Sequence, residues 1–398
     1  MSDSIITEVQ IENALNYMDR YIQKKHLLKI INKWKIKNRT RNRDMFDDII
    51  RAVQFNLIPL DEFRSWLSQN QIDGNNYHFI YDVDFLGLKE TDLEKLTENQ
   101  NIYTINILDI NKDNLEGIAL VHVFKLENRY VLSFLAKGQI SKKKLVGDGT
   151  IKVETENIVY PAFVEFDFNN NNVIVVLNPT ANLVHVNGIQ LGKYNDFSPI
   201  ADEFLKETRK RIGTFYVKKP RWITYALHSL AEEATYHNNP EVESRSIQAQ
   251  EIIEDFARQL LEQNDITDVA LIDSFAAEIQ SAFVMILQEQ FQVITSDSSI
   301  GVFLQKTDQA RTTIELEGKG QNLNIGTPGR IARQCRQDSD LKILGIDIKM
   351  PDENRYRFKI EDGKDHILIR PNNNFTEEEV VQYVLSKLHK HKATALLK

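Results

Sequence analysis

The residues best suited to chemistry lie between Tyr21 and Arg43, where nine Lys or Arg residues occur without a single Asp or Glu. The whole chain, by contrast, has a formal charge of −8. The nine cations are Lys24, Lys25, Lys29, Lys33, Lys35, Lys37, Arg39, Arg41 and Arg43. Cations concentrated in this way repel one another, and a phosphate backbone that neutralises them releases its own counterions. The segment therefore predicts a nucleic-acid-binding surface, although an acidic protein surface would satisfy the same charges.

Arg39, Arg41 and Arg43 alternate with Asn and Thr just before an amphipathic pattern that begins near Asp44. Guanidinium groups and small hydrogen-bond donors beside a helix N-terminus suit a phosphate group. Asp44 could equally cap that helix with no ligand present. These two interpretations are compatible with each other.

Three further groups of cations predict an extended binding track. They are Lys142, Lys143 and Lys144 in a strand connection, then Arg209, Lys210, Arg211, Lys218, Lys219 and Arg221 at a domain boundary, and Arg330, Arg333 and Arg336 on one helix face. Tyr216 and Trp222 lie beside the second group and could stack on bases. The alternative for that group is a basic hinge that pairs with acidic helices downstream. The third group, after Thr327 as N-cap and Pro328 as first helical residue, could instead bind an acidic neighbouring domain or subunit.

Two patterns raise the question of catalysis. His228 and Glu232 have the i to i+4 spacing of metal ligands, but their order is not that of zinc peptidases. Asp347 and Lys349, with Asp338 or Asp340 upstream, resemble the end of a nuclease strand, where acids hold a divalent metal beside a lysine. The competing interpretation is a polar outward edge of a strand meander, which we favour.

The chain has no Gly-rich phosphate loop, no nucleophile elbow and no paired Cys and His site. Its one cysteine, Cys335, cannot form an internal disulfide. We therefore expect no catalytic residue, no resident metal and no cofactor. The N-terminus lacks the pattern of an export signal and no run of eighteen apolar residues occurs, so we expect a cytoplasmic protein with no membrane contact.

Helical periodicity dominates residues 1–98, which we predict to form a helical domain. Apolar residues recur at helical spacing at Leu27 and Ile31, then at Phe46 and Ile50, with the basic stretch between them. Pro59 and Asp61 begin a third helix, and Asp73 with Gly74 is a turn signal that ends it.

Beyond this region apolar residues recur at every second position, as in strands. We therefore predict an antiparallel β domain over residues 99–215, closed by a helix. The expected strand segments are YTINILDI, GIALVHVF, RYVLSFLAK, IKVETENIVY, AFVEFDF and NVIVVLNP. The Asn169–Asn172 tract is the clearest hairpin turn, because Asn tolerates the left-handed backbone conformation.

Residues 216–295 predict a helical segment with two amphipathic helices joined near Thr267, and residues 296–398 predict a C-terminal α+β module. That module would end in a helix from Thr376, as N-cap, to Lys390. Helices and strands occur in separate blocks, so the predicted fold class is multidomain α+β rather than a doubly wound sheet.

The run KKHLLKIINKWKIKNRTRNRDMFDDIIRAV, residues 24–53, resembles the helix, basic loop and helix of SAP-type DNA-binding motifs. The glycine usual in that loop is absent, so Asn38 or Asn42 would stand in its place. The order of a small helical domain before a sheet is also similar to that in the centromere protein N family. This resemblance implies a basic groove for nucleic acid, which would be lined by Lys33, Lys37, Arg39, Arg41, Arg43 and Lys142–Lys144.

Taken together, these patterns predict a protein that binds nucleic acid, and double-stranded DNA first of all, by occupancy or as a subunit of a larger complex. The helices of residues 247–291 and the C-terminal module would supply a surface for self-association or for a protein partner, as in chromosome-associated complexes or bacterial defence against phage. The alternatives are a metal-dependent nuclease that uses Asp347 and Lys349, and a scaffold whose basic segment meets an acidic partner.

Overall fold

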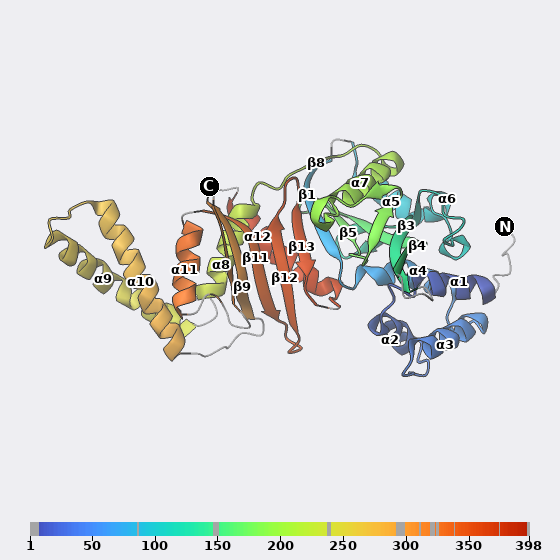
Figure 1. Cartoon of the computed structure of the whole chain (residues 1–398), viewed down its shortest axis with the longest axis horizontal. Coiled ribbons are helices and arrows are strands. Elements are labelled where there is room, and N and C mark those ends of the chain that lie inside the picture. Colours follow the sequence, from blue (N-terminus) through green and yellow to red (C-terminus); the bar gives the residue numbers. More distant parts are fainter. Residues whose placement is uncertain are drawn as a thin grey trace. The chain divides into compact units, whose positions relative to one another are not determined.

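The computed structural model describes residues 8–85, 87–145, 151–236, 240–291, 299–309, 312–318, 323, 326–337, 339–373 and 375–395. The chain forms two compact units, and Figure 1 labels their helices and strands. The first comprises Met1–Pro220 and Asn374–Glu379, and the second comprises Arg221–Asn373 and Val380–Lys398. Helices and antiparallel strands occupy separate blocks, which confirms the α+β class. The four predicted domains thus combine into two units.

Helices form one side of the first unit's core. They are α1 (Glu8–Met18), α2 (Lys24–Lys33), α3 (Asn42–Gln54) and α4 (Leu60–Gln69). The apolar residues that predicted α2 and α3, Leu27 and Phe46 among them, are buried. Their core continues into the sheet through Leu135 and Val159. The helices and the sheet therefore share one core, which is why they form a single unit.

The sheet of the first unit is antiparallel, with the order β1-β5-β4-β3-β6-β7; β2 also pairs with β3, and β8 pairs with β1. The strands are β1 (Tyr77–Asp84), β2 (Ile118–Leu126), β3 (Arg129–Leu145), β4 (Ile151–Asp167), β5 (Asn172–Leu177), β6 (Leu183–Val186), β7 (Ile189–Gln190) and β8 (Tyr216–Lys218). Two segments differ from prediction. The region predicted to be only helical contains β1, and the segment 103–110 predicted as a strand holds a helix end and a 3-10 turn instead.

Local hydrogen bonding explains the second difference. The segment holds the end of α6 (Gln100–Tyr103) and a 3-10 turn at Ile107–Asp109, whose first turn is capped because the side chain of Asn106 accepts from the N–H of Leu108 at 3.2 Å. Such side-chain capping favours a turn over a strand. Helix α5 (Glu90–Glu98) precedes it, and α7 (Ser198–Ile212) is the predicted closing helix.

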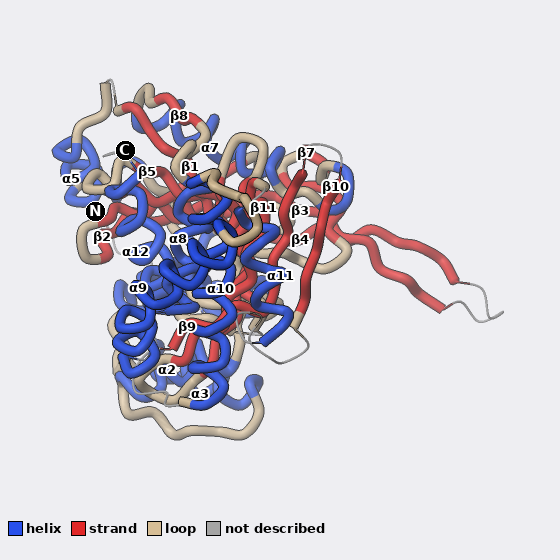
Figure 2. Tube along the Cα trace, turned by 90° about the vertical axis from the view of Figure 1, so that its left-hand side faces the viewer, coloured by secondary structure: helices blue, strands red, loops and turns tan. Residues whose placement is uncertain are grey.

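Two hairpins carry features that the sequence singled out. The predicted Asn turn joins β4 and β5, and Asn171 adopts the left-handed conformation with φ 52°. Strands β3 and β4 continue well beyond the sheet and pair as far as Leu145 opposite Ile151. Figure 2 shows this two-stranded ribbon projecting by itself. We call residues 141–145 and 151–157 the β3–β4 arm. Lys142, Lys143 and Lys144 therefore lie in a strand, not in the connection predicted for them.

The second unit has an antiparallel sheet in the order β10-β9-β11-β12-β13. Its elements are α8 (Ile223–Tyr236), α9 (Pro240–Glu262), α10 (Val269–Gln290), β9 (Ser299–Gln309), β10 (Thr312–Glu317), α11 (Gly326–Gln337), β11 (Asp340–Lys349), β12 (Arg355–Asp362), β13 (Ile367–Pro371) and α12 (Glu378–Ala395). The predicted pair of amphipathic helices is the hairpin α9–α10, in which Asp268 caps α10 by accepting from the N–H of Ala270 at 2.9 Å.

Candidate nucleic-acid interface

The turn between α2 and α3 begins with a tight helix C-terminus. Lys35 has φ 53°, the N–H of Ile36 donates to the carbonyl of Ile31 at 2.9 Å, and that of Lys35 donates to Asn32 at 3.3 Å. This pair of bonds is the Schellman arrangement, in which the left-handed position is usually Gly. A lysine here points an exposed cation outward at the cost of backbone strain.

Five of the nine cations of the basic segment pair with carboxylates that lie outside it in sequence. The pairs are Lys25 with Glu377 at 2.9 Å, Lys29 with Asp73, Lys33 with Glu62, Arg39 with Asp48 at 2.7 Å and Arg43 with Glu12 at 3.0 Å. The hydrogen bond from Arg39 is the main reason that the pKa of Asp48 is lowered. The charge excess seen in the sequence is thus partly neutralised by the fold.

The other four cations, Lys24, Lys35, Lys37 and Arg41, are exposed. Within the described part of the chain, none of them forms an ion pair with a carboxylate. Three of the four lie in the turn between α2 and α3. They are the cations that remain available to an external anion.

Helix α3 begins directly after this turn. Arg41 occupies its N-cap position and no side chain caps the first turn, while Asp44 lies within that turn rather than at the cap. Uncapped N–H groups and the positive end of the helix dipole favour an anion. Arg39, which Asp48 holds, keeps the turn against α3.

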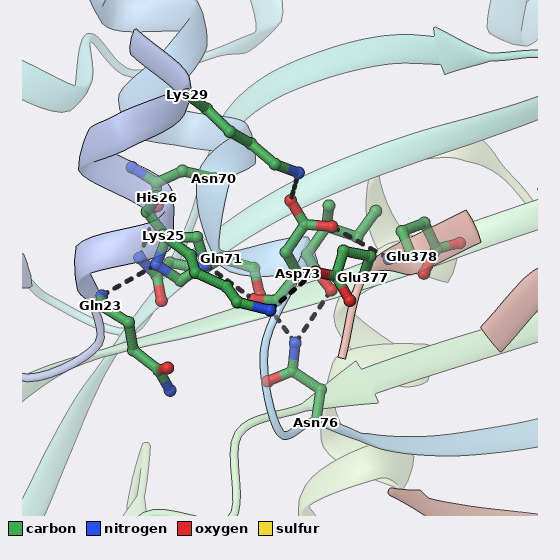
Figure 3. Close-up of polar contacts among 11 residues, drawn as sticks. Gln23, Lys25, His26, Lys29, Asn70, Gln71, Asp73, Asn76, Glu377 and Glu378 are labelled. Carbon is green, nitrogen blue, oxygen red and sulfur yellow. Dashed lines mark hydrogen bonds and ion pairs between the residues drawn. The ribbon is translucent and has the colours of Figure 1, made fainter. Parts of the chain in front are cut away.

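A polar network connects α2 to Asp73 (Figure 3). The N–H of Gln23 donates to Nδ1 of His26 at 2.9 Å, and Nε2 of His26 lies 3.1 Å from the carbonyl of Asp73. Burial lowers the pKa of His26 to about 4. A neutral imidazole with its proton on Nε2 satisfies both hydrogen bonds.

Asp73 is the centre of this network, although its sequence context predicted only a turn. Its carboxylate pairs with Lys29 and accepts from the N–H of Glu378 at 2.9 Å. Gly74 and Thr376 exchange backbone hydrogen bonds beside it. Thr376, predicted as the N-cap of the last helix, therefore lies before α12, and the remote Asp73 caps that helix. No sequence signal marks a cap that is so distant along the chain.

Three of the predicted cations around residues 209–221 form contacts within the first unit. Arg209 donates to the carbonyl of Phe215 at 3.0 Å, while Lys210 and Arg211 both pair with Glu207. Lys218 is exposed, and Lys219 is partly buried. Tyr216 is 58% exposed, but Trp222 is 6% exposed and packs on His389, so it cannot stack on a base as predicted.

Two arginines of α11, Arg333 and Arg336, bond to residues of their own unit. Arg336 is 3% exposed and donates to Glu232 at 2.7 Å and to Gln305, while Arg333 donates to Ser281 at 2.6 Å. Their partners belong to the same unit. Arg336 is buried and Arg333 is largely covered, and both guanidinium groups bond within the unit, so neither presents a free cation to a phosphate. The side chain of Arg330 lies outside the described residues.

The candidate nuclease residues Asp347 and Lys349 form ion pairs with neighbouring residues of the second unit. Asp347 accepts from Arg357 at 3.0 Å, and Lys349 pairs with Glu353. Asp340 lies at the other end of β11, and Asp338 is outside the described residues. In the described part of the chain, no group of three or more His, Cys, Asp or Glu residues could hold a metal ion. The predicted edge position of β11 is wrong, because β11 pairs with β9 on one side and with β12 on the other.

His228 and Glu232 line a cavity of about 620 Å³ in the second unit, with Glu243 and His391 on other helices. Burial is the main cause that lowers the pKa of His228. Glu232 is paired with the two arginines of α11, so it is not a free metal ligand.

Comparison with known families of proteins gave no match to any family model, and no curated protein matches the chain. Across the described residues, every helix is too short or too polar to cross a bilayer.

Proposed function

We propose that the protein binds double-stranded DNA through the α2–α3 turn and the β3–β4 arm, by occupancy and without chemical turnover. The observation that carries the proposal is the set of unneutralised, exposed cations in one turn: Lys35, Lys37 and Arg41. Lys143 of the arm is also exposed, and no described carboxylate pairs with it.

The two parts of the proposed interface belong to the same unit. Arg20, just after α1, lies 4.0 Å from Glu156 of β4, and Tyr21 packs edge-on against Tyr160, so the segment that leads into α2 lies beside the base of the arm. The α2–α3 turn follows at the other end of α2. Cations distributed over two elements match a phosphate backbone better than a single ion would.

The paired cations support the binding in a different way. Exposed ion pairs of this kind contribute about 0–1 kcal/mol each, so phosphates can replace their carboxylates at little cost. Arg39 is held by Asp48 in the free protein, which limits the conformational entropy that the turn loses on binding. Lys33, Arg39 and Arg43 are thus secondary contacts, and the unpaired cations are the primary ones.

A titration tests the proposal. Fluorescence anisotropy of a labelled 30-base-pair duplex is measured at several salt concentrations with the wild type and with Lys37→Glu/Arg41→Glu. We expect affinity to fall as salt rises, and the variant to bind more weakly with a salt slope reduced by about 2. Competition by single-stranded DNA and by an RNA duplex of equal length identifies the preferred nucleic acid.

The matched control is Lys95→Glu/Lys206→Glu, which makes the same charge change on α5 and α7. Figure 1 shows both helices well away from α2 and α3 in this unit. Both lysines are exposed. Equal weakening by the two double variants would mean that net charge alone governs binding. Absence of binding by the wild type at low salt would refute the proposal.

The helical hairpin α9–α10 supports a second proposal, that the protein also associates with another protein chain. Ile252 is 72% exposed, Phe256 53%, Val269 68% and Ile286 63%. Long helices draw most of their stability from a buried apolar face, and so many exposed apolar residues indicate a partner. Light scattering on the wild type and on Ile252→Ser/Phe256→Ser tests this: a monomeric wild type would exclude self-association through the hairpin.

A further inference from the structure

The β3–β4 arm has two unlike faces, which its strand register defines. Residues directly opposite in an antiparallel pair lie on the same face, and neighbours along a strand alternate. Leu145 pairs with Ile151, and Lys143 pairs with Val153, so these four share one face. Lys142, Lys144, Lys152, Glu154 and Glu156 share the other.

On the second face, lysines and glutamates pair with one another. Lys142 pairs with Glu156, while Lys144 and Lys152 lie 3.7 and 3.5 Å from Glu154. The pairs of Lys142 and Lys144 join β3 to β4, whereas that of Lys152 lies within β4, and the face keeps one net positive charge. No apolar surface is present on this side of the described arm beyond Ile140, which is buried at its base.

The first face is apolar and lacks any cover among the described residues. Leu145 is 72% exposed, Ile151 64% and Val153 61%. Burial of such a side chain is worth roughly 1.5–3 kcal/mol, so an arm that keeps three of them in water gives up considerable stability. Scattered exposed apolar residues are ordinary, but three adjacent ones on one face of a projecting ribbon are typical of a binding surface.

The cations around this surface decide what kind of partner covers it. Lys143 lies on the apolar face, whereas Lys142, Lys144 and Lys152 lie on the opposite face, where they pair with Glu154 and Glu156. Two copies of the arm stacked on their apolar faces would bring both Lys143 side chains into one interface, which disfavours self-pairing. An apolar face on a ribbon with more lysines than carboxylates fits a partner whose apolar interior lies between two rows of anions, and a nucleic-acid duplex has that structure.

We propose that the β3–β4 arm inserts Leu145 and Ile151 as an apolar wedge between base pairs of bound duplex DNA, while Lys143 and Lys144 contact the flanking phosphates. This inference rests on the proposed function and adds a mode of binding to it. A two-stranded ribbon is narrow enough to enter a duplex groove. Leu and Ile wedges unstack base steps, and the energy lost in unstacking is offset by the contacts that the bent duplex gains.

The wedge predicts a preference that does not depend on base sequence. Unstacking is easier at a mismatch, so a duplex with one central mismatch should bind more tightly than the matched duplex. We compare the affinities of the two 30-base-pair duplexes and record the fluorescence of 2-aminopurine placed beside the mismatch. The wild type should prefer the mismatched duplex by roughly threefold to tenfold and raise the fluorescence, because 1.4 kcal/mol corresponds to tenfold.

Two variants distinguish the contribution of the apolar side chains to binding from that of the charged ones. Leu145→Ser/Ile151→Ser keeps every lysine, and both side chains are exposed, so the fold should be retained. We expect this variant to bind matched duplex within about twofold of the wild type but to lose the mismatch preference and the fluorescence rise. The control Lys152→Gln/Glu154→Gln changes the opposite face without changing net charge, and it should keep both signals.

The outcomes distinguish the two proposals. Duplex binding with equal affinities and no fluorescence rise in the wild type would overturn the wedge and leave the proposed function standing. If the protein binds no duplex but binds vesicles of phosphatidylserine and phosphatidylcholine, and Leu145→Ser/Ile151→Ser abolishes that binding, the arm is a membrane contact and both proposals fail. A signal of the same size in the serine variant would also overturn the wedge.

Discussion

Asp73 caps a helix that begins far along the chain: its Oδ1 accepts a hydrogen bond from the N–H of Glu378 at 2.9 Å. The same carboxylate pairs with Lys29 of α2, next to the proposed interface. One buried side chain thus ties the basic helix to the start of α12 within the first unit. Stability and the position of the binding surface depend on the same residue.

Replacement of Asp73 by Ala should therefore lower the free energy of unfolding by about 2–3 kcal/mol, because a helix cap and a buried acceptor are lost together. Asp73→Asn keeps an oxygen for the cap and should cost about 1 kcal/mol. Urea denaturation measures both. Equal losses for the two variants would show that the charge on Asp73, rather than the cap, supplies the stability.

The stability of the first unit should fall on acidification because His26 is buried. Its pKa is lowered from 6.5 to about 4, so between these values the unfolded chain binds a proton that the folded chain does not. Stability therefore decreases as pH falls through this window, by about 2 kcal/mol at pH 5 for this residue. Half-buried His122 and buried His78, with pKa values lowered to about 4 and about 3, act in the same direction.

Urea denaturation at pH 7 and pH 5 checks the expectation. His26→Gln should be less stable at pH 7, since it loses the bonds to Gln23 and Asp73, but it should lose less stability on going to pH 5. An identical pH dependence in the variant would show that His26 is protonated in the folded protein.

Arg129 should be among the most sensitive positions in the sheet. It pairs with Glu165 and lies 2.8 Å from Glu378, and all three side chains are buried. Burial raises the pKa of Glu165 against the lowering effect of Arg129. Removing one member of a buried pair leaves an uncompensated charge, so Arg129→Leu should cost about 3–5 kcal/mol. Arg129→Leu/Glu165→Leu should cost less, and chemical denaturation of both variants tests this ordering.

Lys35 allows folding and binding to be separated by one substitution. Its left-handed conformation suits Gly, so Lys35→Gly should leave the free energy of unfolding unchanged or raise it by up to about 1 kcal/mol. The same change removes an exposed cation and should weaken duplex binding, with a salt slope lower by about 1. Thermal denaturation and anisotropy measure the two effects. A stable variant that binds DNA as tightly as the wild type would exclude Lys35 from the interface.

Local patterns predicted much of the fold correctly. Apolar spacing predicted α2 and α3, and the Asn tract predicted the turn at Asn171, because these features depend on neighbours along the chain. The same reasoning misplaced residues 103–110, where the capping by Asn106 outweighed strand propensity. It also missed β1, whose pairing with β5 is a contact between distant segments.

By itself, the sequence determined helices such as α2 and α3 and the concentration of cations between Tyr21 and Arg43, since both follow from residue type and spacing. Only the tertiary structure decided which cations remain unpaired, because carboxylates such as Glu62 and Glu377 approach the segment only after folding. It also buried Arg336 and extended β3 through Lys144. Charge acts through space, so the sequence order of charged residues cannot show which of them neutralise one another.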